Sequence, residues 1–233
     1  MSEQQPFGFQ SFIGQTDAVG IFLFLVLLVM SVASWTVIIN KTRLVVGLGR
    51  AEAGLLGEFA GLQNLDGLRT WANQPSTALN RDILGIVQAS LSAAQWAQLD
   101  RVGALISVES PSELLSRSLQ QAIDEASSAM ESGQTLLASV ASSAPFVGLF
   151  GTVWGIYHAL LSIGASGQSS LDQVAGPVGE ALIMTALGLA VAIPAALAYN
   201  AFQRQTRLRL ARLERLAHRL FVFVSTGLPP RGL

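Results

Sequence analysis

Charged residues are few in this sequence and cysteine is absent. The first feature argues against a class of protein, and the second excludes two kinds of site. The 233 residues include no cysteine, which excludes disulfide bonds and thiolate metal sites, and we expect neither a metal nor another cofactor. Only 12% of the residues are charged, whereas 51% are hydrophobic and the mean hydropathy is +0.48. This balance argues against a soluble protein and indicates several membrane spans. The net charge of −1 gives no field that attracts nucleic acid, so no nucleic-acid partner is expected.

Long apolar runs take the place of the missing charge. Three segments reach the roughly 20 residues that a helix needs to cross a hydrocarbon core of about 30 Å; they cover residues 18–39, 136–163 and 176–202. Each is predicted to be a helix, because a chain in lipid must satisfy its own backbone hydrogen bonds. The N-terminus lacks the basic start of a signal peptide, so we interpret the first run as a retained span. The predicted fold class is an all-α integral membrane protein with three transmembrane helices and long cytoplasmic helical extensions.

The basic residues predict the orientation of these spans. Of the 14 lysines and arginines, seven lie from Lys41 to Arg117 and seven from Arg204 to Arg231. Segments rich in basic residues stay on the cytoplasmic side of a membrane. The prediction is therefore an outer N-terminus at 1–17, a cytoplasmic helical domain at 40–135, an outer loop at 164–175 and a cytoplasmic C-terminal helix at 203–233.

The cytoplasmic segments are predicted to be amphipathic helices. Ser110, Pro111 and Glu113 have the pattern of a capping box with proline at the first helical position, and we expect this helix to continue into the second span. Apolar residues then recur at helical spacing: Leu115, Leu119, Ala122, Ile123, Ala126 and Met130. The tail repeats the pattern with Leu213, Leu216, Leu220 and Val224. Its arginines are expected on other faces, in water or against lipid headgroups: Arg209, Arg212, Arg215 and Arg219.

Small residues distinguish the second and third spans from the first. The first span is rich in Leu, Val, Ile and Phe, and we expect it to face membrane lipids. The other two carry small residues of the kind through which helices pack closely in membranes: Ala144, Gly148, Gly151, Gly155, Ala159 and Gly188. This set is larger than one helical hairpin requires, which suggests a homo-oligomeric ring.

Two threonines lie deep within these spans. Thr152 is about 16 Å and Thr185 about 13 Å from the outer end of its helix, at a rise of 1.5 Å per residue. The two hydroxyls could therefore share one height in an antiparallel hairpin. Alternatively, each hydroxyl bonds to a carbonyl of its own helix.

Glu180, Pro194 and His158 also stand out within the predicted spans. Glu180, the only carboxylate there, either marks an ion pathway or lies near the outer interface at the positive end of its helix. Pro194 predicts a helix kink, and His158 an interfacial position. One carboxylate per subunit is too few for a proton wire, so a buried aspartate or lysine that carries the proton has to come from a partner.

Two stretches carry a family resemblance, PFVGLFGTVWGI at 145–156 and EALIMTALGLAVAIPAALAYN at 180–200. They resemble the ExbB/TolQ branch of the proton-channel proteins related to the flagellar stator subunit MotA. The resemblance implies a pentamer in the Gram-negative inner membrane, with a periplasmic N-terminus and a cytoplasmic C-terminus. It further implies that the ring encloses single spans of an ExbD-like protein, whose intramembrane aspartate takes up the proton, and that a TonB-like protein receives the work. Thr152, Thr185 and Glu180 would face the pore, and Thr152 would offer its hydroxyl to the aspartate.

The sequence departs from the family pattern at two places, and the resemblance is compatible with more than one function. The family's Pro-Gly pair is reversed here to Gly176-Pro177, and Tyr157 stands where methionine is usual. The first hypothesis is an ExbB-like subunit that energises uptake of iron-siderophores and vitamin B12, and the second is a TolQ-like subunit of the Tol-Pal envelope-constriction system. A passive membrane scaffold would need the small residues but not the hydroxyls. We do not expect an enzyme, because the sequence has no phosphate loop, metal cluster or acid pair.

Overall fold

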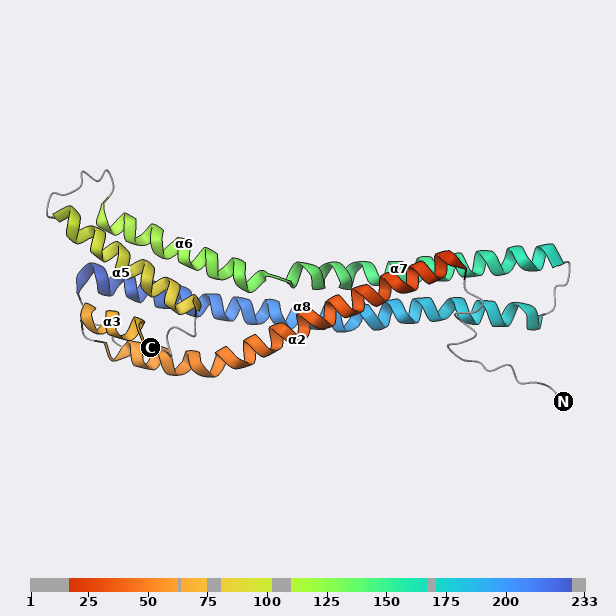
Figure 1. Cartoon of the computed structure of the whole chain (residues 1–233), viewed down its shortest axis with the longest axis horizontal. Helices are drawn as coiled ribbons and strands as arrows, with labels where there is room; N and C mark the ends of the chain where they lie inside the picture. The colour runs from red at the N-terminus through yellow and green to blue at the C-terminus, as the bar shows by residue number, and fades with distance from the viewer. Residues whose placement is uncertain (1–16, 63, 75–80, 102–109, 167–170, 228–233) are drawn as a thin grey trace. The chain divides into compact units, whose positions relative to one another are not determined.

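A computed structural model describes residues 17–227, except 63, 75–80, 102–109 and 167–170 (Figure 1). Every regular element within these residues is a helix: α2 (Ala18–Ala60), α3 (Leu65–Ala72), α5 (Arg81–Arg101), α6 (Pro111–Glu131), α7 (Gln134–Ser166) and α8 (Leu171–Thr226). Three stretches of the described chain are long and apolar enough to cross a membrane, and the second of them runs through both α6 and α7: Ala18–Val45, Pro111–Leu161 and Ala181–Thr226. The predicted all-α class with three candidate spans is confirmed.

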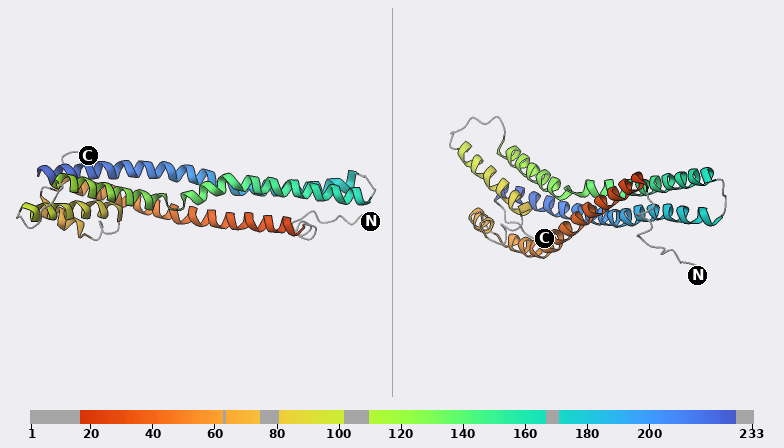
Figure 2. Two further views of the ribbon diagram at one scale, coloured as in Figure 1. Left: turned by 90° about the horizontal axis from the view of Figure 1, so that it is seen from above. Right: turned by 45° about the vertical axis from the view of Figure 1, so that its right-hand side comes forward.

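The chain divides into two compact units. The span unit contains residues 17–40 and 133–201, and therefore the first part of α2, all of α7 and the first part of α8. The core unit contains residues 41–132 and 202–227, and therefore α3, α5, α6 and the remaining parts of α2 and α8. Within the span unit, α7 and α8 run antiparallel and side by side (Figure 1, Figure 2).

The core unit is held by the apolar stripes that the sequence predicts. The stripe of α6 is buried at Leu115, Leu119, Ile123, Ala126 and Met130. Leu213, Leu216 and Leu220 of α8 belong to the same buried cluster, together with residues of α3 and α5. The apolar area that these helices remove from water stabilises the unit. One expectation is wrong: Arg209 is buried, because it lies four residues before Leu213 and so on the buried stripe.

The capping box at the start of α6 is confirmed. The backbone N–H of Glu113 donates to Ser110 Oγ at 3.4 Å, and the backbone N–H of Ser110 donates to Glu113 Oε2 at 3.1 Å. Pro111 occupies the first turn, where its missing N–H costs nothing. The first orphan donors of the helix are thus satisfied by its own side chains.

The expected continuous helix from Ser110 into the second span is wrong. Helix α6 ends at Glu131 and α7 begins at Gln134. Gly133 between them has φ 78°, a left-handed conformation that glycine adopts without the steric cost of a Cβ. Lys41 Nζ donates to the carbonyl of Met130 at 2.6 Å and also to that of Ser132. The lysine therefore satisfies carbonyls that the end of α6 leaves open.

The hairpin of α7 and α8 is longer than expected at its turn. Helix α7 continues to Ser166 and α8 starts at Leu171, so residues 164–166 and 171–175 of the expected loop are helical. The third span was predicted to start at Gly176, next to Pro177. Helix α8 starts five residues before that position. Helix α8 remains helical through Pro194, and a kink there stays a prediction.

Replacing Gly133 by alanine is expected to lower the thermal unfolding midpoint of the purified protein in detergent. Alanine at a left-handed φ costs about 1 kcal/mol, and its Cβ would lie 3.1 Å from Val37 Cγ1. Gly85→Ala in α5 is the matched control, because nothing lies within 4 Å of its new Cβ and alanine favours helix. Equal midpoints for the two variants would contradict a special role for Gly133.

Candidate functional site

Helices α7 and α8 meet backbone to backbone at two glycines. A Cβ on Gly148 would lie 2.6 Å from the carbonyl oxygen of Met184 and 3.0 Å from the Cα of Gly188. A Cβ on Gly188 would lie 2.7 Å from the carbonyl oxygen of Ala144. These contacts are with backbone atoms, which cannot move aside as a flexible side chain can. Only glycine fits either position at this helix separation.

The other small residues of α7 extend this close contact. A Cβ on Gly151 would lie 3.1 Å from Met184 Cβ, and one on Gly155 would lie 2.9 Å from Ala181 Cβ. Ala144 and Ala159 are buried. The small residues therefore have partners or burial within a single chain. Their number does not by itself argue for a ring.

Two threonine hydroxyls meet one turn away from the glycine contact. Thr152 Oγ1 lies 2.5 Å from Thr185 Oγ1, and Thr152 is only 6% exposed. The same oxygen lies 3.1 Å from the carbonyl oxygen of Gly148, on its own helix, and 3.0 Å from that of Ala181, on α8. Thr152 therefore lies within hydrogen-bond distance of a carbonyl of its own helix, and its hydroxyl also lies at the same height as that of Thr185 in the hairpin.

Counting protons gives this hydrogen-bonded pair a direction. A threonine hydroxyl has one proton and two acceptor lone pairs, whereas a carbonyl oxygen only accepts. Thr152 lies within hydrogen-bond distance of two carbonyl oxygens, so its single proton is directed to them. The proton between the hydroxyls then belongs to Thr185, which donates to Thr152. Thr185 Oγ1 donates its own proton and keeps both acceptor lone pairs, and Thr185 is partly exposed.

The structure describes the backbone but not the side chain of Glu180. This residue is helical within α8, one position before Ala181, whose carbonyl accepts from Thr152. A role of its carboxylate in the pore stays a prediction.

An aromatic and charged cluster surrounds His158 near the end of α7. The imidazole centroid is 4.6 Å from that of Trp154 and 5.3 Å from that of Tyr157. Its Nε2 lies 3.4 Å from Asp17 Oδ2, just before α2. Sequence reasoning did not pair these residues. The available signal was the position of Asp17 directly before an apolar run, where a helix N-cap is expected.

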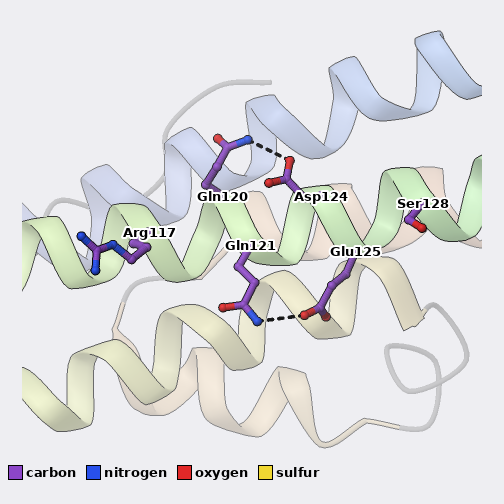
Figure 3. Close-up of a pocket in the computed structure, with 6 residues that line it drawn as sticks. All are labelled: Arg117, Gln120, Gln121, Asp124, Glu125 and Ser128. Atoms are coloured by element: carbon purple, nitrogen blue, oxygen red, sulfur yellow. Dashed lines mark hydrogen bonds between the residues drawn. The ribbon is translucent and has the colours of Figure 1, made fainter.

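A shallow hollow of about 390 Å³ on α6 is not assigned a function. Figure 3 shows its six lining residues, which all come from this one helix: Arg117, Gln120, Gln121, Asp124, Glu125 and Ser128. The amides of Gln120 and Gln121 donate to the carboxylates one turn later, at 3.1 and 3.0 Å. A ligand site normally brings polar groups together from several elements, and this hollow does not.

Comparisons with known proteins find a family whose model covers the residues of the hairpin. Residues 86–215 match the model of the MotA/TolQ/ExbB proton channel family. The biopolymer transport protein ExbB of Xanthomonas campestris is 41% identical over 90% of this chain and 83% of its own length. The ExbB protein of Neisseria meningitidis is 36% identical over 88% of this chain and 92% of its own length. The Tol-Pal system protein TolQ of Haemophilus influenzae is 31% identical over 75% of each chain.

Replacing Gly148 by alanine is expected to force α7 and α8 apart and to destabilise the protein. Overpacking of this kind costs about 1–3 kcal/mol, so the thermal unfolding midpoint in detergent should fall. Gly164→Ala is the matched control on the same helix, because nothing lies within 4 Å of its new Cβ. An unchanged midpoint for Gly148→Ala would show that the helices do not touch at this glycine.

Proposed function

Since the chain belongs to the MotA/TolQ/ExbB proton channel family, we propose that it is an ExbB-like subunit of a proton-driven motor in a Gram-negative inner membrane. The motor energises TonB-dependent transport of iron-siderophores and vitamin B12 across the outer membrane. The ExbB relatives support this assignment over a TolQ-like role, because they share 36–41% identity over about nine tenths of the chain. The TolQ relative shares 31% over three quarters.

The proposed assembly is a pentamer that surrounds the single spans of an ExbD-like partner. The first part of α2 faces lipid, as its apolar and highly exposed residues Phe22, Val29 and Val32 favour. The N-terminus is periplasmic and the C-terminus cytoplasmic, as the distribution of basic residues favours. The pair Thr152–Thr185 and Glu180 face the partner.

The hydroxyl pair carries the proposed mechanism. A partner aspartate that has taken up a proton is neutral, so its burial against the hairpin no longer has the cost of burying a charge. Its O–H donates to Thr185 Oγ1, because that oxygen has the free acceptor capacity and Thr152 has no free proton to offer. The expected donation from Thr152 to a charged aspartate is therefore replaced by acceptance at Thr185. The pair selects the neutral acid, which can then move past the apolar surface of the ring.

Thr185→Val is expected to slow uptake of siderophore-bound iron by about tenfold or more while leaving assembly intact. A lost hydrogen bond of about 1.5 kcal/mol corresponds to roughly that factor. Thr152→Val should act in the same direction, because it removes the acceptor that orients Thr185. Serine at either position keeps the hydroxyl and should retain transport.

Thr36→Val is the matched control for these variants. Thr36 lies in α2, is exposed, and donates to the carbonyl of Val32 on its own helix at 2.7 Å. Normal uptake is expected for this variant. Normal uptake in Thr152→Val and Thr185→Val as well would favour a passive scaffold, which needs the glycines but not the hydroxyls.

A deletion strain without a functional duplicate separates the ExbB-like from the TolQ-like role. We expect loss of growth on siderophore-bound iron with an intact envelope. A detergent-sensitive, chain-forming strain with normal iron uptake would instead assign the protein to the Tol-Pal system. Complementation with the Thr36→Val variant controls for expression of the reintroduced gene.

A further inference from the structure

The two residues between α6 and α7 contain no side chain that breaks a helix. Ser132 has φ −49° and ψ 129° and Gly133 has φ 78°, angles typical of the two central residues of a type II turn. Neither residue is proline, and Pro145 lies inside α7 without ending it. Serine and glycine can both adopt helical angles. The local sequence therefore permits a continuous helix, and the turn needs a cause outside these two residues.

Lys41 of α2 binds the backbone at this turn. Its ammonium group donates to the carbonyl of Met130 at 2.6 Å and also to the carbonyl of Ser132. In a continuous helix each carbonyl accepts the N–H of the residue four positions later, so the carbonyl of Ser132 would accept from Leu136. In the structure the lysine supplies a donor to this carbonyl. The turn and the lysine therefore fit each other, whereas a continuous helix would use the same carbonyl for itself.

The inward direction of Lys41 is unusual for a lysine at the end of a membrane span. Such lysines ordinarily extend toward the water and the lipid headgroups. Arg43, two residues later, is exposed, whereas Lys41 is half-buried. Lys41 follows Val37 by one turn on the same face of α2, and a Cβ on Gly133 would lie 3.1 Å from Val37 Cγ1. Two successive turns of α2 therefore lie against the two residues of the break.

We propose that residues 131–134 form a two-state hinge and that Lys41 is the residue that positions it. With Lys41 bound, the chain makes the turn and α7 begins at Gln134. With Lys41 withdrawn, residues 132 and 133 become helical and α6 continues into α7. A displacement of α2 then changes the helix that carries Thr152. The inference rests on the proposed function for its use, because a motor subunit needs a conformational step that reaches the proton site.

Hydrogen exchange of the full-length protein in lipid nanodiscs tests the hinge. Lys41→Met keeps the length of the side chain but removes its donors. The N–H groups of residues 135 and 136 precede the bond that Leu137 donates to the carbonyl of Gly133 at 3.3 Å, and they gain carbonyl partners when the helix is continuous. We therefore expect their exchange to slow by about tenfold or more in Lys41→Met. Lys41→Arg keeps the donors and should exchange as the unchanged protein does.

Arg43→Met is the matched control for the lysine variant. It removes one positive charge from the same end of α2, but from a side chain that is exposed. Exchange at residues 135 and 136 should stay unchanged. Loss of a simple helix cap would leave exchange at these amides in Lys41→Met equal or faster, and either result would overturn the hinge.

A double-mutant cycle with Gly133 tests the same claim through stability. In the unchanged protein Gly133→Ala should lower the thermal unfolding midpoint, because φ is left-handed there. In the Lys41→Met background residue 133 is helical, and alanine is favoured over glycine in a helix. The same substitution should then raise the midpoint, and it should restore assembly if Lys41→Met alone does not assemble. An equal fall in both backgrounds, or no rescue, would show that the turn persists without the lysine and would overturn the inference.

The tests of the hinge and of the proposed channel have separate readouts. Neither hydrogen exchange nor the unfolding midpoint needs transport. Normal iron uptake by the threonine variants would sink the proposed channel without changing exchange at the hinge. Unchanged exchange in Lys41→Met would remove the hinge and leave the channel standing.

Discussion

The close approach of α7 and α8 at Gly148 and Gly188 is the constraint on which the rest of the site depends. Without side chains at these positions, the backbones come so near that an added Cβ would lie 2.6–2.7 Å from a carbonyl oxygen of the other helix. Thr152 follows Gly148 by one helical turn, and Thr185 precedes Gly188 by about one turn. The 2.5 Å contact between their hydroxyls is therefore a consequence of the glycine packing.

The hydroxyl pair of the hairpin limits what this chain can do with a proton. Hydroxyls do not change charge in the physiological range, so Thr152 and Thr185 can orient and select a titrating group but cannot replace it. This is why the proposed mechanism requires an acid from a partner.

Features that depend on spacing along one helix could be predicted from the sequence, and features that depend on a second helix could not. The capping box at Ser110 and the buried stripe after it follow from the helical repeat. The break at Gly133 had a signal, the glycine itself, but its close contact with Val37 is made by a residue of another helix. Arg209 was misplaced because its charge outweighed its position on the stripe. The direction of the threonine hydrogen bonds depends on the carbonyl of Ala181, which lies across the hairpin.

The most direct test of the proposed mechanism is a high-resolution cryo-electron microscopy structure of this chain with its single-span partner in lipid. The quantity to measure is the distance from Thr185 Oγ1 to the nearest carboxyl oxygen of the partner. We expect a direct hydrogen bond of about 2.5–3.0 Å, or a bridge through one water, in at least one subunit. A threonine pair covered by side chains of its own ring, with the partner's carboxyl group bound elsewhere, would contradict the mechanism.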